Sequence, residues 1–299
     1  MISNKQRQKI SALKKEYELL RTGRESLLVL LEESELPELV YNSNAIENST
    51  LTLKETEKIL LEQEVMRDVS VRELYEAKNL ARVTEYIRNN PDLQLTSETI
   101  LLLHQMLIGG IDDSVAGRYR KEHEYVRVGS HIAPAPEHVQ RLLDDIIVDY
   151  KSADDEYFLE RISKFHLEFE SIHPFNDGNG RIGRVLIHLQ LTKLGYPPLT
   201  IRNKGKNDNY YPAFGDYQDD KSTKRLDNLL SLCLIESLNK RLTYLRSEKI
   251  VALSDYAKQT KQTVNPLLNA ARRQTIPAFR EKGKWKIGTL SAKSIKIGA

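Results

Sequence analysis

Apolar residues recur at helical spacing along most of this chain. The first stretch, residues 5–36, places apolar side chains three and four positions apart, at Ile10, Leu13, Tyr17 and Leu20. Pro37 interrupts this pattern, and we expect it to open a new helix over residues 38–46, because proline suits a first helical turn. Thr52-Leu-Lys-Glu55 resembles a capping box and predicts another helix start. The pattern therefore predicts a helical N-terminal region.

The same spacing predicts helices over 71–89, 96–109, 137–151, 157–171, 181–195 and 227–247. Residues 117–136 differ, because β-branched and aromatic residues around Gly129 predict a short hairpin. We expect a mainly α fold in three parts. These are an N-terminal helical region (1–92), a helical core carrying the hairpin (93–247) and a small C-terminal module (248–299).

Composition narrows the class of protein. Cys233 is the single cysteine, which excludes an internal disulfide framework and a cysteine-based zinc site and fits a reducing cytosol. No apolar run approaches the length of a bilayer span, and the polar residues 1–10 do not resemble a secretory signal. We therefore expect a cytoplasmic protein without a membrane segment.

The net charge of +3 hides a gradient. Residues 240–299 carry 14 basic and three acidic residues, a charge of +11, which leaves −8 for the remainder. The segments 254–259, 264–273 and 275–288 follow the order of a winged helix-turn-helix, and the last resembles the wing of excisionase-type DNA readers. Five basic residues would then meet DNA phosphates: Arg272, Arg273, Lys282, Lys284 and Lys286. A basic dimerisation or protein-docking module fits the same pattern.

Residues 173–184 carry the most informative chemistry. This loop between two predicted helices holds three glycines, two arginines, an acid and a histidine. Glycines let backbone N–H groups approach a ligand at the positive end of the next helix, which favours an anion such as phosphate. Asp177 can hold Mg²⁺ together with phosphate oxygens, and His173 can accept a proton near neutral pH. The pattern predicts a phosphate site.

Other interpretations of this loop are weaker. The dinucleotide fingerprint requires a preceding strand, a calcium loop requires glutamate where His188 stands, and a P-loop requires lysine followed by Ser or Thr. A glycine-rich helix connector with a structural histidine is the remaining alternative.

The segment resembles the signature of the Fic family, His-Pro-Phe-x-(Asp/Glu)-Gly-Asn-Gly-Arg-x-x-Arg, at every fixed position. Residues 117–120, 126–131, 134–136 and 166–172 are also similar to family segments, so the resemblance covers about residues 37–235. It implies a Fic-type helical core with a hairpin flap. It also implies transfer of AMP from ATP to a Ser, Thr or Tyr hydroxyl of a target protein.

The resemblance implies a role for each motif residue. His173 would be the catalytic base and Asp177 the magnesium (Mg²⁺) ligand. The nucleotide would contact the loop and first helical turn, at Gly178, Asn179, Gly180, Arg181, Ile182, Gly183 and Arg184. Asn179 and the backbone around it would hold the α-phosphate, and the two arginines would hold the β- and γ-phosphates.

Two further segments complete the implied nucleotide site. The flap, which would also pair with the target segment, comprises Val128, Gly129, Ser130 and His131. Adenine and ribose would contact Tyr210, Tyr211 and Gln218, the last standing where the family more often has asparagine.

Ser43, Glu47 and Asn48 suggest a built-in inhibitor. Ser43 and Glu47 alone form an unremarkable i,i+4 helix pair. Family members with an inhibitory helix carry (Ser/Thr)-x-x-x-Glu-(Gly/Asn), and the resemblance implies that Glu47 pairs with Arg184 and misplaces ATP. It also implies a possible homodimer, self-AMPylation or removal of AMP. Two alternatives stay open: a DNA-binding transcriptional regulator with a nucleotide-sensing core, and transfer of another nucleotide or phosphate-containing group.

Overall fold

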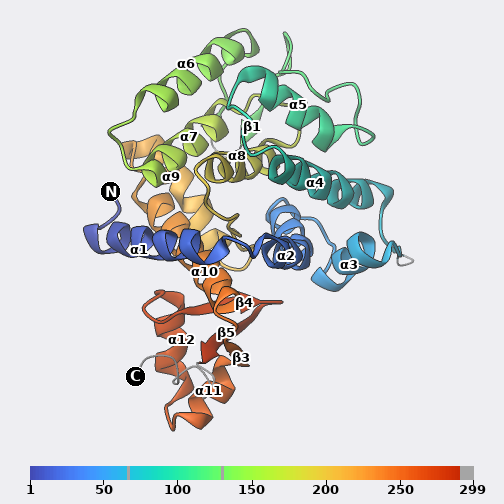
Figure 1. The fold of residues 1–299 in the computed structure, drawn as a ribbon. Helices are drawn as coiled ribbons and strands as arrows, with labels where there is room; N and C mark the ends of the chain where they lie inside the picture. The colour runs from blue at the N-terminus through green and yellow to red at the C-terminus, as the bar shows by residue number, and fades with distance from the viewer. Residues whose placement is uncertain (66–67, 129–130, 290–299) are drawn as a thin grey trace. The chain divides into compact units, whose positions relative to one another are not determined.

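The computed structural model describes residues 1–65, 68–128 and 131–289, and the prediction of a mainly α fold is confirmed (Figure 1). The helices are α1 Asn4–Arg21, α2 Glu25–Ile46, α3 Leu53–Glu57, α4 Val71–Asn89, α5 Ser97–Ile108, α6 Val139–Ser152, α7 Phe158–Ile172, α8 Asn179–Lys193, α9 Tyr211–Asp220, α10 Lys224–Leu245, α11 Leu253–Gln259 and α12 Val264–Arg272. Short helical turns cover Lys58–Glu62 (η1), Pro136–His138 (η2) and Lys206–Tyr210 (η3). The strands are β1 Arg127–Val128, β2 His131–Ile132, β3 Lys249–Ala252, β4 Ala278–Glu281 and β5 Lys284–Thr289.

The chain forms two compact units. The first contains residue 1 and residues 37–230, and the second contains residues 2–36 and 231–299. The three-part division expected from the sequence stays a prediction. Among the described residues, none of the helices combines the length and apolar character needed to cross a lipid bilayer.

The predicted break at Pro37 is wrong. The first helix ends at Arg21, and the chain turns at Gly23, which has a left-handed φ of +75°. Helix α2 then runs without interruption through Pro37. A proline inside a helix removes one backbone hydrogen bond. Burial of the next turn, which includes Leu39 and Val40, compensates for that loss.

Several helix boundaries follow the sequence signals. The side chain of Thr52 accepts a hydrogen bond from the Glu55 N–H, and the Glu55 carboxylate accepts one from the Thr52 N–H. This reciprocal pair confirms the expected capping box. Thr96 caps α5, which ends at Gly109 as predicted.

Helix α8 forms the centre of the first unit. It is buried almost all round, as expected of a helix surrounded by others. Helices α4, α5 and α7 pack against it, and α6 packs on α7 (Figure 1). Phe165, Leu167 and Phe169 of α7 supply much of the apolar core. This packing fixes the N-terminal end of α8, where the glycine-rich loop enters.

The predicted hairpin is present as two very short antiparallel strands. Arg127 pairs with Ile132 and Val128 with His131. Gly129 and Ser130 lie outside the described residues.

In the second unit, residues 249–289 form a three-stranded antiparallel sheet in the order β3-β5-β4, together with α11 and α12. Their shared core consists of Leu253, Ala257, Leu267, Ala271, Ala278 and Ile287. The helix–helix–hairpin order follows the sequence expectation, and its identification as a winged helix stays a prediction. Strand β3 was not expected. Its four residues are followed directly by α11 and are too few to show an alternation of apolar and polar side chains.

Candidate active site

The glycine-rich loop reverses direction between α7 and α8. Both ends of the loop use left-handed backbone, at His173 (φ 50°) and at Gly178 (φ 81°). A methyl group on Gly178 would lie 2.9 Å from Ile108 Cδ1. Glycine is therefore required at this turn for its backbone angle and for space.

Asn179 closes the loop. Its Oδ1 accepts a hydrogen bond from the Phe175 N–H at 2.9 Å, and its Nδ2 donates to the Phe175 carbonyl at 2.7 Å. The buried side-chain amide of Asn179 therefore makes two hydrogen bonds, one as donor and one as acceptor, and both join it to the backbone of Phe175. The chemistry that the loop offers a ligand comes from its backbone N–H groups and flanking side chains.

His104, which sequence reasoning missed, supports the loop from α5. Its Nε2 donates to the Asp177 carbonyl at 3.0 Å, and its Nδ1 accepts from the Gly117 N–H at 3.0 Å. The ring stacks on Phe175, with 3.6 Å between the ring centroids. Burial lowers the pKa of His104 to about 4, so the ring is neutral, as these two hydrogen bonds require. The sequence carries no signal for this role, because His104 lies alone among the apolar residues of a helix.

His173 is held as a neutral base. Its carbonyl accepts a hydrogen bond from Arg120 Nε at 2.8 Å. Its Nδ1 lies 3.4 Å from the Glu170 carbonyl, and donation to this oxygen leaves Nε2 unprotonated. Burial lowers the pKa of His173 to about 4. Burial, with the charge of Glu47, raises the pKa of the nearby Glu170 carboxyl to about 8.

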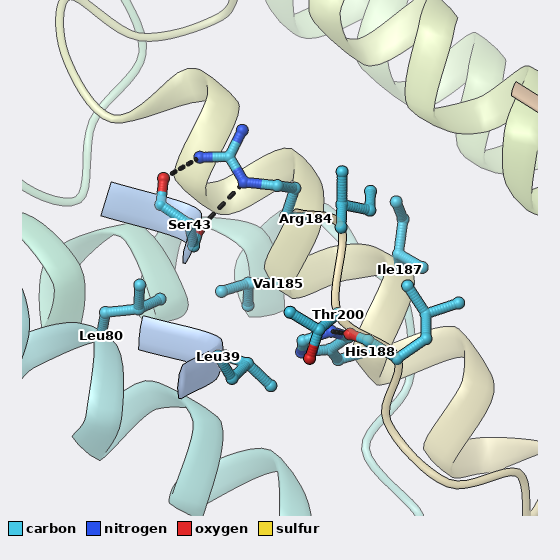
Figure 2. A pocket seen from close by; sticks show the side chains of 10 residues that line it. Leu39, Ser43, Leu80, Arg184, Val185, Ile187, His188 and Thr200 are labelled. Carbon is cyan, nitrogen blue, oxygen red and sulfur yellow. Dashed lines mark hydrogen bonds between the residues drawn. The ribbon is translucent and has the colours of Figure 1, made fainter. Parts of the chain in front are cut away.

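Arg184 is bound to the C-terminal end of α2. Its Nε donates to Ser43 Oγ at 2.9 Å and its Nη2 to the Ser43 carbonyl at 2.8 Å (Figure 2). The same Nη2 lies 2.9 Å from Glu47 Oε1. A methyl group on Gly180 would lie 2.2 Å from this carboxylate oxygen. The Glu47 carboxylate therefore lies against the first turn of α8, where the helix dipole attracts an anion.

Figure 2 also shows a pocket that Ser43 and Arg184 help to line. It is lined mainly by aliphatic side chains of α2, α4, α8 and residues 199–201. His188 Nε2 donates to the Leu199 carbonyl at 2.8 Å, so this histidine has a structural partner. The lining favours packing rather than binding of a charged group.

Residues 202–211 hold the end of α2. Lys206 Nζ donates to the carbonyls of Ala45 and Ile46 at 3.0 and 2.9 Å and to Asn48 Oδ1 at 3.1 Å. The Tyr211 hydroxyl donates to the Ile46 carbonyl at 2.6 Å. These contacts satisfy carbonyls that a helix end leaves without partners. Arg202 pairs with Glu38, and the Asn203 N–H donates to Asn42 Oδ1.

Tyr210 is buried beside Arg184. Its hydroxyl accepts from Arg184 Nη1 at 3.4 Å and lies 2.9 Å from His166 Nε2. Burial lowers the pKa of His166 to about 3. Tyr210 and Tyr211 thus contact Arg184 and α2, whereas Gln218 is exposed on α9.

Asp177 and Arg181 lie at the other end of the motif. Arg181 Nη2 lies 3.0 Å from Asp177 Oδ1, and its Nη1 lies 3.1 Å from Glu76 Oε1. Arg72 pairs with Asp177 Oδ2, and its Nε donates to Glu76 Oε1 at 3.1 Å. Burial raises the pKa of Asp177, but the charges of Arg181 and Arg72 outweigh it and hold this pKa below its ordinary value. Arg72 and Glu76 of α4 were not predicted.

Asp177 is compatible with a divalent cation. Within residues 1–65, 68–128 and 131–289, no three His, Cys, Asp or Glu side chains gather as a metal site. Mg²⁺ nevertheless often binds to one carboxylate together with phosphate oxygens, so a single carboxylate can suffice where a ligand supplies the other donors. The donor chemistry therefore fits Mg²⁺ bound together with a phosphate ligand.

The remaining motif positions pack inward. Ile182 is fully buried, and a methyl group on Gly183 would lie 2.3 Å from Glu170 Oε1. In the hairpin, His131 Nε2 donates to the Ser171 carbonyl at 2.8 Å, which ties β2 to the last turn of α7. Val128 is exposed.

Comparison with known proteins identifies similar sequences. Residues 94–191 match the model of the Fic/DOC family. The chain is 31% identical over 176 residues to a protein adenylyltransferase Fic of Nematostella vectensis, covering 57% of this chain and 41% of that protein. It is 28% identical over 258 residues to a protein of the same name from Drosophila yakuba, and this match covers 82% of this chain and 50% of that protein. The chain thus spans at most about half the length of these relatives.

Two solved structures share the fold. A Fic domain containing signaling protein from Bacteroides thetaiotaomicron superposes with a TM-score of 0.72 at 24% identity, covering 81% of this chain and 98% of that one. Fic-1 from C. elegans superposes with a TM-score of 0.65 at 23% sequence identity, and the match covers 79% of this chain and 71% of that one. Residues 94–191 therefore match the Fic/DOC family model, and the fold of this chain is similar to the folds of these two structures.

Proposed function

We propose that this protein is an autoinhibited protein adenylyltransferase that transfers AMP from ATP to a Ser, Thr or Tyr hydroxyl of a target protein. The observation that carries this proposal is the convergence of one neutral histidine, one carboxylate and two arginines on the N-terminal end of α8. Such a site can deprotonate a hydroxyl and stabilise charge on a polyphosphate. The curated relatives carry the name of this activity.

In the proposed reaction, His173 Nε2 takes the proton of the target hydroxyl as its oxygen attacks the α-phosphorus. The bond to the bridging oxygen breaks, and pyrophosphate leaves. The N–H groups at the start of α8 receive the α-phosphate charge, and Arg181 and Arg184 bind the leaving phosphates. Asp177 would hold Mg²⁺, which neutralises phosphate charge when bound.

The contact between Glu47 and Arg184 supports the proposed inhibition. Glu47, directly after α2, lies against the first turn of α8 and pairs with Arg184. It therefore takes both the position of an anion and one of the proposed phosphate ligands. ATP would then bind without Arg184, with its α-phosphate poorly aligned for attack. Release of α2 would give the active form.

The test is incubation with Mg²⁺ and ATP labelled at the α-phosphorus. We expect label in protein with Glu47→Gly, far less with wild type, and none with Glu47→Gly/His173→Ala. Equal labelling with and without His173 would overturn the proposal. Labelling from GTP, UTP or CDP-choline but not from ATP would change the transferred group.

The same assay addresses the related proposals. Label on the protein itself would report self-AMPylation, and loss of label after removal of ATP would report removal of AMP. Light scattering would report a homodimer.

DNA binding is a second candidate function, as a regulator with a nucleotide-sensing core. Arg272 at the end of α12, Arg273 directly after it, and Lys282 and Lys284 between β4 and the start of β5 are exposed. Their exposure and positive charge support contact with phosphates. Lys286 pairs with Glu281. A shift with duplex DNA that weakens with salt and is lost in Arg272→Ala/Arg273→Ala would support this function. No shift at low salt would exclude it.

A further inference from the structure

Four charged side chains form a closed ring at the Asp177 end of the site. Arg72 contacts Asp177 and Glu76, and Arg181 contacts the same two acids. The two acids and two arginines therefore alternate around the ring. The pocket that these groups border is also lined by Glu47, Asn48, Ser49, Glu73 and Gly178.

The ring divides the Asp177 carboxylate between two cations. Oδ1 faces Arg181, and Oδ2 faces Arg72. A metal ion bound to Asp177 would need one of these oxygens. Each oxygen keeps a second lone pair, but a guanidinium in contact with the carboxylate repels a divalent cation and occupies the space beside that oxygen. Metal binding is therefore favoured when one arginine moves away.

The two arginines differ in their freedom to leave. The side chain of Arg181 is 4% exposed and that of Arg72 is 57% exposed. Moving a buried guanidinium away from its carboxylates would leave an unpaired charge in the interior, which is costly, whereas an exposed one returns to water. Arg72 is therefore the ligand that can be displaced.

Glu76 limits how far Arg72 can travel. It stands one helical turn along α4 and accepts from Arg72 Nε at 3.1 Å. Only the Nη2 end of the guanidinium contacts Asp177. A side-chain rotation can thus free Oδ2 while Arg72 keeps its bond to Glu76.

We propose that Arg72 occupies the metal position on Asp177 and must leave Oδ2 before Mg²⁺ and nucleotide bind together. Arg72 is a positioning residue that sets the Mg²⁺ concentration at which the nucleotide is accepted. This inference rests on the proposed function. It adds a second contact that opposes nucleotide binding, separate from Glu47.

The test measures nucleotide binding rather than turnover. An ATP analogue with a methylene bridge between the α- and β-phosphorus is titrated into Glu47→Gly and Glu47→Gly/Arg72→Ala by calorimetry, across a Mg²⁺ series and in EDTA. We expect loss of Arg72 to lower the half-saturating Mg²⁺ concentration by about threefold to tenfold, the range for an exposed charge near a dication. In EDTA, binding should not weaken.

The matched control is Arg141→Ala. Arg141 also forms an exposed i,i+4 pair, with Asp145 on α6, and should leave the Mg²⁺ dependence unchanged. Melting temperatures of all variants, taken without ligand, report whether each is folded.

The outcomes separate this inference from the proposed function. An unchanged Mg²⁺ dependence in folded Arg72→Ala overturns the inference alone. Weaker analogue binding with and without Mg²⁺ also overturns it, because Arg72 would then be a phosphate ligand. If Glu47→Gly binds no nucleotide under any condition, the proposed function fails and the inference falls with it.

Discussion

Arg184 binds Ser43 through two separate atoms, the side-chain hydroxyl at 2.9 Å and the backbone carbonyl at 2.8 Å. Ser43 therefore binds the Arg184 guanidinium directly, in addition to lying one helical turn before Glu47. Burial disfavours the charge of Arg184, but nearby Tyr210 and Glu47 raise its pKa above the ordinary value. The contact that we propose to be inhibitory is a buried, charged hydrogen-bond cluster centred on Arg184.

Ser43→Ala should weaken inhibition without abolishing it. The variant loses the hydroxyl acceptor, while the carbonyl and Glu47 still bind Arg184. A hydrogen bond to a charged group contributes about 1.5–3 kcal/mol, so the released fraction should rise about tenfold or more. We expect adenylylation between that of wild type and Glu47→Gly, measured with α-labelled ATP. Ser43→Thr keeps the hydroxyl, and activation of that variant equal to Ser43→Ala would contradict the role of the hydroxyl.

Lys206→Ala should also release α2. Its ammonium binds two carbonyls and one side chain at the helix end, and these acceptors would lose a charged donor. We expect faster amide exchange at the C-terminal turn of α2 and a several-fold rise in labelling. Lys204→Ala is the matched control, because Lys204 is exposed on the same segment. An equal rise in both variants would point to general loss of positive charge.

The pH dependence of the reaction should reflect a buried base. Burial, with a smaller contribution from Arg120, lowers the pKa of His173 to about 4, even though the Glu170 carbonyl and Glu47 act in the opposite direction. The neutral form therefore persists as the pH falls below 6.5, and rates of Glu47→Gly should decline only below about pH 5. A rate that halves near pH 6.5 would contradict this prediction.

Stability must be followed over the same pH range. Burial lowers the pKa values of His104 and His188 to about 4. The unfolded chain therefore binds protons at these positions between about pH 6.5 and 4 while the folded chain does not, and folding stability falls as the pH falls. Circular dichroism at each pH separates loss of fold from protonation of His173.

Asn179→Ala should destabilise the fold as well as the site. It leaves the Phe175 N–H and carbonyl without their partner in a buried loop. The expected cost is about 1–3 kcal/mol for each group left unsatisfied, measured by urea unfolding. Asn179→Asp keeps the acceptor for the Phe175 N–H but loses the donor to the carbonyl. An alanine variant as stable as wild type would show that the loop closes by other means.

Local features of the site could be predicted from sequence. The turn at Gly178 and the start of α8 follow from adjacent residues, and the resemblance implied the Glu47–Arg184 pair before the structure placed them 2.9 Å apart. Capping boxes and glycine turns are likewise set by neighbours in the chain, which is why Thr52 and Gly109 were identified.

Apart from the Glu47–Arg184 pair, which the resemblance implied, the contacts between distant segments of the site could not be predicted. Arg72 and Glu76 form an ordinary i,i+4 helix pair, and only the packing of α4 on α8 brings them to Asp177. The role of Lys206 could not be read from the sequence, because a side chain that binds the end of a distant helix leaves no pattern in its own segment. The helix break predicted at Pro37 was wrong because burial of the residues that follow outweighs the local preference of proline against a helix interior.

Because Glu47 is tethered to the same chain as Arg184, it acts as an intramolecular ligand with its own effective concentration. Under the proposed function, a nucleotide that needs Arg184 competes with Glu47 for it. The dissociation constant of the wild type would then equal the intrinsic constant divided by the fraction of molecules in which α2 is released. The ratio of nucleotide dissociation constants between wild type and Glu47→Gly would then measure the closing equilibrium of α2 directly. Any partner that binds the end of α2 would shift that ratio without touching the phosphates.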